Sequence, residues 1–309
     1  MELSAELLGR LKPEWDRAPG DPEMTAFKRQ ARRRQAMWRA QQGLDFGEHP
    51  PENKNGSVLK EEDGNAYANF LSPRIVEAVK HRLHEDQRQT SQQLQEPRLL
   101  NHLLSSMPMC FNLYGELHND PERLTAAGKA LWNVQEEGQA VKFEWSPGRH
   151  DARYTGDGTA FDVALFFGEP GGASRTVIGI ETKYHEHAVT ESEPNAVTRL
   201  PRYTEIAEKS QAFKPDWRKR ILGTELQQVW RDHLLLLAML QDEERPRTLG
   251  TYVLVYPEGN TSFARLAERY MDALEDTSTF RHVTLESLLD AHVLHARDTE
   301  QRFRDRYLF

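Results

Sequence analysis

The apolar residues of this chain follow two different periods, which divide it into helical and extended parts. Apolar positions at helical spacing, with polar residues between them, predict amphipathic helices. Short segments that alternate, or that are rich in β-branched and aromatic residues, predict strands. The expected helices cover about 1–42, a segment starting at 73, 97–117, 217–242, 263–274 and 285–294. The expected strands cover 140–145, 161–167, 176–184 and 251–256.

The connections between these elements indicate the fold class. Residues 43–66 are rich in Gly, Pro and Asn and are expected to form a loop. A short Gly-rich link at 168–172 joins the second and third strands, so an antiparallel hairpin is expected there. The order helix, three strands, helix, strand predicts an α/β fold with a mixed sheet. We expect a helical N-terminal extension over 1–95 and a core with C-terminal helices over 96–309.

Composition narrows the class of protein. The chain has 38% hydrophobic and 28% charged residues, and its longest aliphatic block, 234–240, is much shorter than a membrane span requires. The N-terminus lacks the basic and apolar pattern of a secretion signal, which predicts a cytoplasmic protein. Cys110 is the only cysteine, so an internal disulfide is excluded. Cys110 has an apolar setting that favours a buried thiol over a nucleophile with His118 as its base.

The distribution of charge qualifies the net value. A formal charge of −8 argues against binding to nucleic acid, which depends on neutralising phosphates. Basic residues nevertheless gather in two segments, where they form either a polyanion-binding surface or a solvated helix face. The first segment contains Lys28, Arg29, Arg32, Arg33, Arg34 and Arg39, and the second contains Lys214, Arg218, Lys219 and Arg220.

Three charged residues stand out in the apolar strands. Glu181 and Lys183 are two positions apart, so their side chains leave the third strand on the same face. Asp162 is the single charge of the second strand. Charges in such strands are costly to bury unless they have a partner, for example a metal ion. Carboxylates supply the hard oxygen ligands of Mg²⁺, which activates water and polarises a phosphodiester, and a nearby ammonium can offset charge in the transition state.

These residues carry a resemblance to a known family. Asp162, followed after eighteen residues by Glu181-Thr182-Lys183, resembles the active-site pattern of the PD-(D/E)XK nuclease superfamily, whose core is αβββαβ. The segments FNLYGEL, WSPGR, AFDVAL and GIETKYHE, at 111–117, 145–149, 160–165 and 179–186, are similar to a bacterial group of restriction-endonuclease-like proteins. The resemblance implies metal-dependent hydrolysis of DNA. Asp162 and Glu181 would be metal ligands and Lys183 the catalytic lysine, with Mg²⁺ as the cofactor and Mn²⁺ as a substitute.

Other polar residues have a functional and a structural interpretation each. Many superfamily members place a further metal-binding carboxylate where Glu116 lies, near the end of the helix before the first strand; the alternative is an exposed helix end. Glu144 faces either the site or solvent. Asp157 is a turn residue, and the substitute if Asp162 faces the core. Some superfamily nucleases use a helical glutamine to orient the lysine or water, which makes Gln228 a catalytic candidate. His185 is a candidate phosphate contact.

The preferred interpretation is an endonuclease acting on DNA, within a restriction or other defence system. One alternative is a non-catalytic nucleic-acid-binding or assembly protein that keeps the nuclease fold, which the acidic net charge favours. A nuclease acting on RNA or branched DNA is another, because the scissile phosphodiester is alike in each. Cleavage of both strands of a duplex often uses two copies of a site, which favours a homodimer. A partner methyltransferase is left open.

Overall fold

The computed structural model describes residues 25–48, 54–88, 94–245, 247 and 249–309. The chain divides into two compact units. The first draws its residues from the ranges 1–116, 184–186 and 295–309, and the second from 117–183 and 187–294. The part of the helix expected over 1–42 that precedes residue 25 lies outside the described residues.

The first unit is mainly helical. Its helix α2 begins at the cap residue Thr25, whose side chain accepts a hydrogen bond from the Lys28 N–H at 3.1 Å. The strands β1 and β2 form a small antiparallel sheet within this unit. Its elements are α2 (Ala26–Gln41), β1 (Phe46–Glu48), β2 (Lys54–Leu59), α3 (Glu61–Asn65), α4 (Pro73–Arg88), α5 (Glu96–Asn101), α6 (Ser106–Tyr114) and the C-terminal α13 (Arg297–Tyr307). A 3-10 turn, η2 (Gly115–Leu117), lies where the chain passes to the second unit.

A buried arginine joins α13 to the N-terminal part of the first unit. The Arg306 side chain is fully buried, and its Nε donates to Gln35 Oε1 at 2.9 Å. Its Nη1 donates to the Asn69 carbonyl at 2.7 Å, and its guanidinium lies 4.0 Å from the ring centroid of Trp38. A buried cation with this many partners stabilises the association of α13 with α2, because each donor replaces a lost contact with water.

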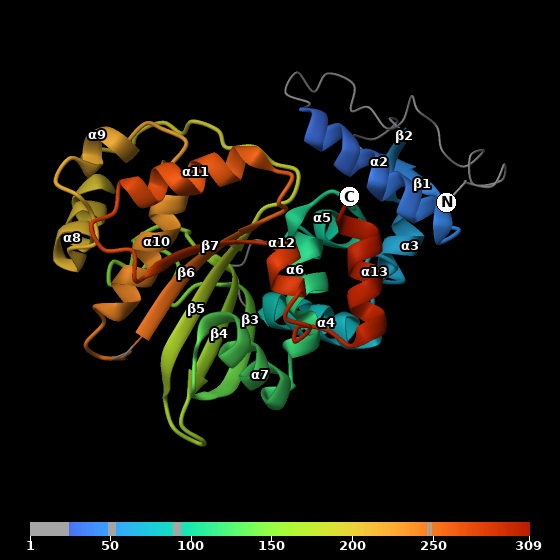
Figure 1. Cartoon of the computed structure of the whole chain (residues 1–309), viewed down its shortest axis with the longest axis horizontal. Helices are drawn as coiled ribbons and strands as arrows, with labels where there is room; N and C mark the ends of the chain where they lie inside the picture. The colour runs from blue at the N-terminus through green and yellow to red at the C-terminus, as the bar shows by residue number, and fades with distance from the viewer. Residues whose placement is uncertain (1–24, 49–53, 89–93, 246, 248) are drawn as a thin grey trace. The chain divides into compact units, whose positions relative to one another are not determined.

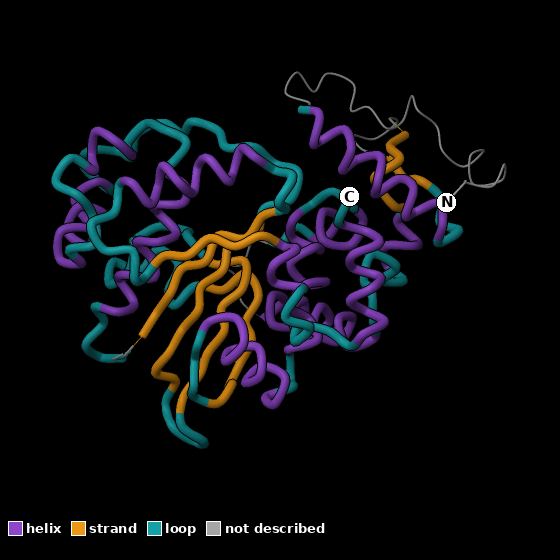
Figure 2. Tube along the Cα trace, viewed as in Figure 1, coloured by secondary structure: helices purple, strands orange, loops and turns teal. Residues whose placement is uncertain are grey.

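The second unit is built on one five-stranded mixed sheet, coloured orange in Figure 2. The strands lie in the order β3-β4-β5-β6-β7, which is also their order in the chain. Strand β4 is antiparallel to both of its neighbours, β3 and β5, whereas β6 and β7 continue parallel to β5. Their bounds are β3 (Glu137–Trp145), β4 (Phe161–Gly168), β5 (Ser174–Thr182), β6 (Leu249–Tyr256) and β7 (Phe280–Thr284).

Helices pack on both faces of this sheet. A Cβ at Gly128 of α7 would lie 2.5 Å from the Phe167 ring, so α7 packs closely on the face that Phe167 shares with Val163 and Leu165. On the other face, Leu236 of α10 approaches Gly250 of β6. The helices of this unit are α7 (Pro121–Trp132), α8 (Leu200–Ser210), α9 (Trp217–Ile221), α10 (Gln227–Leu240), α11 (Thr261–Asp272) and α12 (Leu285–Leu289), labelled in Figure 1.

The structure confirms the predicted fold class and corrects several elements. The mixed sheet, the β4–β5 hairpin and the αβββαβ order are as expected, but the helix that precedes β3 is α7 and not the helix expected over 97–117. The segment 43–66, expected as a loop, contains β1, β2 and α3. The helices expected over 97–117 and 217–242 are each interrupted: His102 has an extended backbone, and so does Leu222. The sequence analysis missed α7, α8, β7 and α13.

The two units also differ from the division expected at residues 95 and 96. The first unit runs on to residue 116, and α13 belongs to it rather than to the unit of the sheet. The buried contacts of Arg306 with Gln35 and Asn69 give the physical reason. Among the described residues, no helix combines the length and the apolar character needed to cross a membrane.

Candidate active site

Three carboxylates occupy one row across adjacent strands of the sheet. Phe143 of β3 pairs with Val163 of β4, and Val163 pairs with Ile180 of β5. The neighbours of these residues are Glu144, Asp162 and Glu181, which therefore lie opposite one another and leave the sheet next to each other. Like charges that face each other across strands are destabilising unless a cation or a proton intervenes. The antiparallel register, which the hairpin sets, thus creates a site of concentrated negative charge.

Asp162 occupies the centre of this row. Its Oδ2 accepts a hydrogen bond from the backbone N–H of Thr182 at 2.8 Å, which fixes the carboxylate against the end of β5. Removal from water raises the pKa of Asp162 well above its usual range, and repulsion from Glu181 and then Glu144 raises it further. Attraction to Lys183 and the Thr182 hydrogen bond only partly oppose this increase. Asp162 therefore lies close enough to Glu181 and Lys183 to interact with both.

Glu181 and Lys183 form an ion pair at the end of β5. The Lys183 Nζ lies 2.7 Å from Glu181 Oε1, and only 9% of Lys183 and 8% of Glu181 are exposed. The Lys183 backbone N–H donates to the Val255 carbonyl at 2.8 Å, so pairing with β6 continues past the last residue of β5. From α10, Gln228 Nε2 reaches Glu181 Oε1 at 3.5 Å, the outer limit of a hydrogen bond.

Glu144 has a backbone conformation that a glutamate rarely adopts. Its φ of 45° lies in the left-handed region, which costs about 1 kcal/mol or more for a residue with a side chain. The Arg149 Nη2 lies 3.8 Å from Glu144 Oε2, while Arg149 Nη1 donates to the Gly158 carbonyl at 2.8 Å. Strain of this kind persists where the surroundings impose it, and it is frequent at functional sites. Here it accompanies a carboxylate at the edge of the acidic row.

A comparison with protein families shows which family the chain belongs to. A family model described as the PD-(D/E)XK nuclease superfamily matches residues 20–309, nearly the whole chain. The chain belongs to this superfamily. No curated protein matches the chain, and no solved structure does. Nucleases of this superfamily usually use divalent metal ions, and their fold is that of enzymes acting on nucleic acids.

A further acid, which was not singled out from the sequence, lies close enough to Glu181 and Lys183 to interact with both. Asp232 lies on α10, one helical turn after Gln228, and only 5% of it is exposed. Burial and repulsion from Glu181 raise the pKa of Asp232 well above its usual range, against the attraction of Arg231 and Lys183. A signal was present in the sequence: Asp232 is the single acid between residues 226 and 241, four positions after the candidate glutamine.

Two other acidic candidates are engaged elsewhere. Asp157 accepts hydrogen bonds from the hydroxyl of Thr155, the N–H of Thr159 and the hydroxyl of Tyr203. Burial opposes the ionisation of Asp157, but these hydrogen bonds outweigh it and hold its pKa below the usual range. The network explains Asp157 as a structural turn residue, the alternative considered from the sequence.

Glu116 belongs to the first unit and is buried there, not exposed at a helix end. Its carboxylate accepts the Ala296 N–H at 2.6 Å and the Thr299 hydroxyl at 2.8 Å, at the start of α13. Burial disfavours its charge, but these bonds and one from Ser72 hold the pKa of Glu116 below its usual range. A carboxylate at a helix N-terminus interacts favourably with the helix dipole, so these contacts give Glu116 a structural role in the first unit.

The two remaining candidates, His185 and Cys110, are described by their burial. Burial lowers the pKa of His185, which also belongs to the first unit, and its Nδ1 is a buried atom without a hydrogen bond. Cys110 is buried in α6, as its apolar setting predicts. Within the described ranges, no three His, Cys, Asp or Glu side chains are arranged so that they could hold a metal ion.

The two basic segments contribute fewer available cations than their sequences indicate. In α2, Arg32 and Arg39 are buried and donate to Ser57 and to the Gly56 carbonyl, so they stabilise the first unit. The cations of the second segment are mostly paired with nearby acids; Arg220, for example, binds Asp216 at 2.8 Å.

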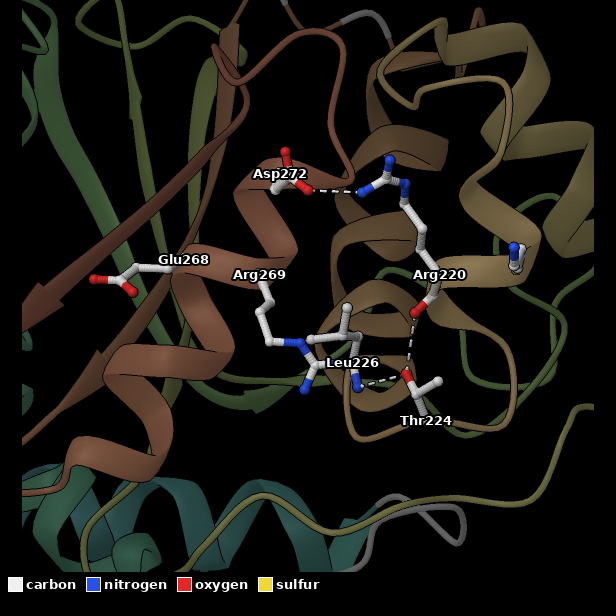
Figure 3. A pocket seen from close by; sticks show the side chains of 7 residues that line it. Arg220, Thr224, Leu226, Glu268, Arg269 and Asp272 are labelled. Carbon is white, nitrogen blue, oxygen red and sulfur yellow. Dashed lines mark hydrogen bonds and ion pairs between the residues drawn. The ribbon is translucent and has the colours of Figure 1, made fainter.

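A surface pocket of about 450 Å³ adjoins this second segment (Figure 3). The close-up shows Arg220 pointing to Asp272, and Arg269 and Glu268 lie on the same α11. The pocket lining therefore carries both signs of charge, and its arginines already have acidic partners: Asp272 for Arg220, and Glu225 for Arg269. The surface lacks the excess positive charge that attracts a polyanion.

Proposed function

We propose that the protein is a divalent-metal-dependent nuclease that hydrolyses DNA phosphodiester bonds, as an endonuclease of a restriction or other defence system. One observation carries the proposal: Asp162, Glu181 and Lys183 meet at the same end of β4 and β5, next to Glu144. A cluster of carboxylates with one ammonium suits a metal-assisted attack on a phosphate.

The site residues divide into ligands and a charged donor. Asp162 and Glu181 would hold Mg²⁺ or Mn²⁺, since carboxylate oxygens are the ligands these hard cations prefer. The raised pKa of Asp162, caused by burial and by Glu181 and Glu144, marks a donor set that a cation would stabilise. When bound, the metal would supply a Lewis acid and an activated water. Lys183 would hold that water and offset negative charge on the phosphate, and Gln228 would orient Glu181.

Glu144 is a stronger candidate than Glu116 for a carboxylate that assists this centre, although no three acids of the described residues are arranged as a metal-ligand set. Glu144 is in register with Asp162 and raises its pKa, whereas both Glu116 oxygens accept hydrogen bonds from the start of α13. Glu116 as a metal ligand stays a prediction. Binding of Mn²⁺ to the protein without DNA distinguishes the two glutamates. Glu144→Gln should weaken this binding, and Glu116→Gln should not.

The test is cleavage of supercoiled plasmid with Mg²⁺ or Mn²⁺, analysed on a gel. Lys183→Ala should abolish nicking while DNA binding is retained, because the side chain acts in the chemical step, and its unfolding midpoint should fall because Glu181 loses a buried partner. Lys219→Ala, which removes an exposed lysine from α9, is the matched control and should cleave as the wild type does. Equal cleavage by wild type and Lys183→Ala would reject the assignment.

A second candidate is a nucleic-acid-binding or assembly protein without catalysis, and the acidic net charge of −8 favours its assembly form because it disfavours binding to phosphates. DNA retention without nicking under either metal would favour it. RNA and branched DNA belong in the same assay, since the site would treat their phosphodiesters alike.

A homodimer, proposed because duplex cleavage needs two cuts, predicts twice the monomer mass in solution. A methyltransferase encoded beside the gene would support a restriction role.

A further inference from the structure

Asp232 is a buried acid whose surroundings do not explain it as a structural residue. It lies on α10 between Arg231 and His233, and only 5% of it is exposed. The hydroxyl of Tyr252 on β6 donates to its Oδ2 at 3.5 Å, and in the described chain no other hydrogen bond to this carboxylate is found. A bond of that length contributes little, so the carboxylate is poorly satisfied.

The position of Asp232 relates it to the site on two sides. Gln228, one turn earlier on the same helix face, reaches Glu181. Tyr252 pairs with Gly179, which lies two residues before Glu181 on the same face of β5. The Asp232 carboxylate therefore lies on the same side of the sheet as the Glu181–Lys183 pair and is close enough to interact with both residues.

Both cations near Asp232 are also held by another carboxylate. Arg231 and Lys183 both attract its carboxylate. The guanidinium of Arg231, however, makes contacts of 3.0 and 3.4 Å with the Glu191 carboxylate, in the connection that follows β5. The Lys183 ammonium instead lies against Glu181 Oε1 at 2.7 Å, an oxygen that the proposed function assigns to a metal ion.

We propose that Asp232 is a positioning residue of the centre, whose carboxylate holds the Lys183 ammonium beside Asp162 when Glu181 binds a cation. A lysine that loses its partner to a metal ion would be repelled by that ion and would turn away. A second carboxylate behind it prevents this, which explains why the chain keeps an acid in a buried helix position where an apolar residue would be more stable. The inference rests on the proposed function for the role of Lys183, but the pairing itself is a separate claim.

The first experiment separates positioning from binding. Asp232→Asn keeps the shape and removes the charge, and it should lower kcat about 10- to 100-fold, as is typical for partners of metal ligands, with KM for DNA changed less than about threefold. Asp232→Glu, which restores the charge, should recover part of that loss. Asp272→Asn removes the same charge from an exposed position of α11 and should leave kcat unchanged. Asp232→Asn with kcat within about twofold of wild type would overturn the inference.

The second experiment needs no catalysis. Lysines are reductively methylated with ¹³C, the Lys183 resonance is assigned from Lys183→Arg, and spectra are recorded with Mg²⁺ and without DNA. Asp232→Asn should move the Lys183 resonance and few others, whereas Asp272→Asn should leave it in place. Asp232→Ser serves for the same comparison if the asparagine variant does not fold. An unmoved Lys183 resonance rejects the pairing. A moved resonance in a protein that never cleaves DNA keeps the pairing and rejects the nuclease function.

Discussion

Both units of the molecule bury charged side chains, but they treat them in opposite ways. In the first unit, Arg306 and Glu116 are surrounded by hydrogen-bond partners that match their charge. In the second, the half-buried Asp162 and the buried Asp232 lie near other carboxylates, and each accepts one hydrogen bond from the described residues. The first pattern lowers the pKa of Glu116, and the second raises the pKa of both aspartates.

The difference indicates which buried charges support the fold and which are kept for function. A buried charge with all its partners stabilises the folded chain and ties distant segments together, as Arg306 ties α13 to α2. A buried charge among like charges weakens the folded chain, and such groups persist where chemistry needs them. Substitutions in the two units should therefore have opposite signatures, in activity for one and in stability for the other.

The largest effect is expected at Asp162. Asp162→Asn should lower kcat more than about 100-fold, beyond the loss typical of an outer partner, because it removes a proposed metal ligand. The same change should not lower the thermal midpoint at pH 8, since it removes a carboxylate that burial and Glu181 disfavour. Steady-state kinetics and calorimetry on the same preparation measure both. If Asp162→Asn is clearly less stable than the wild type, Asp162 has a structural role, as Arg306 does.

The reverse signature is expected at Arg306. Arg306→Met leaves the acceptors on Gln35 and Asn69 without their donor, and the free energy of unfolding should fall by about 3 kcal/mol or more. The activity of the folded fraction should be unchanged. Urea titration with a cleavage assay measures this, and Arg297→Met, at an exposed position of the same helix, is the control. Equal stability of the two variants would remove the contrast between the units.

The sequence predicts those features of the site that depend on residues close together in the chain. Glu181 and Lys183 share a face because they are two residues apart in a strand, and the Gly-rich link predicts the hairpin that brings Asp162 beside them. The four-strand core was predicted for the same reason. Short polar helices such as α8 and α13 carry weak periodicity, and their formation depends on contacts with distant segments, so the sequence analysis missed them.

Residues whose surroundings depend on tertiary packing were beyond the sequence analysis. The burial of Asp232 depends on how α10 lies over β6, and the partners of Glu116 come from a helix 180 residues later. The basic residues of α2 show the same limit. In the sequence, Arg39 cannot be distinguished from a phosphate-binding arginine, whereas the structure shows that it donates a hydrogen bond to the Gly56 carbonyl. Charge is visible in a sequence, but whether a charge has a partner is not.

The smallest effect tests the comparison within one helix, where His233 follows Asp232. Both ring nitrogens of His233 are 2.9 Å from hydroxyl groups, of Tyr270 and of Thr279, and burial lowers its pKa to about 3. His233 therefore takes up a proton near pH 6.5 in the unfolded chain but stays neutral there in the folded chain. The stability that His233 contributes is present above pH 6.5 and is lost as the pH falls below this value. At pH 5 the loss should be about 2 kcal/mol, from 1.36 kcal/mol per pKa unit.

His233→Gln, which is neutral at every pH, should lack this component, and urea titrations of both proteins at pH 7 and pH 5 measure the difference. Asp232→Asn in the same assay should act in the other direction: the carboxylate, whose pKa is raised in the folded chain, weakens folding as the pH rises, so its removal should help most at high pH. The opposite result would be the same pH dependence of stability in both variants. A buried group with its hydrogen-bond partners, such as His233, and one without them, such as Asp232, would then affect folding alike. Hydrogen bonding of buried groups would not separate structural from functional residues in this protein.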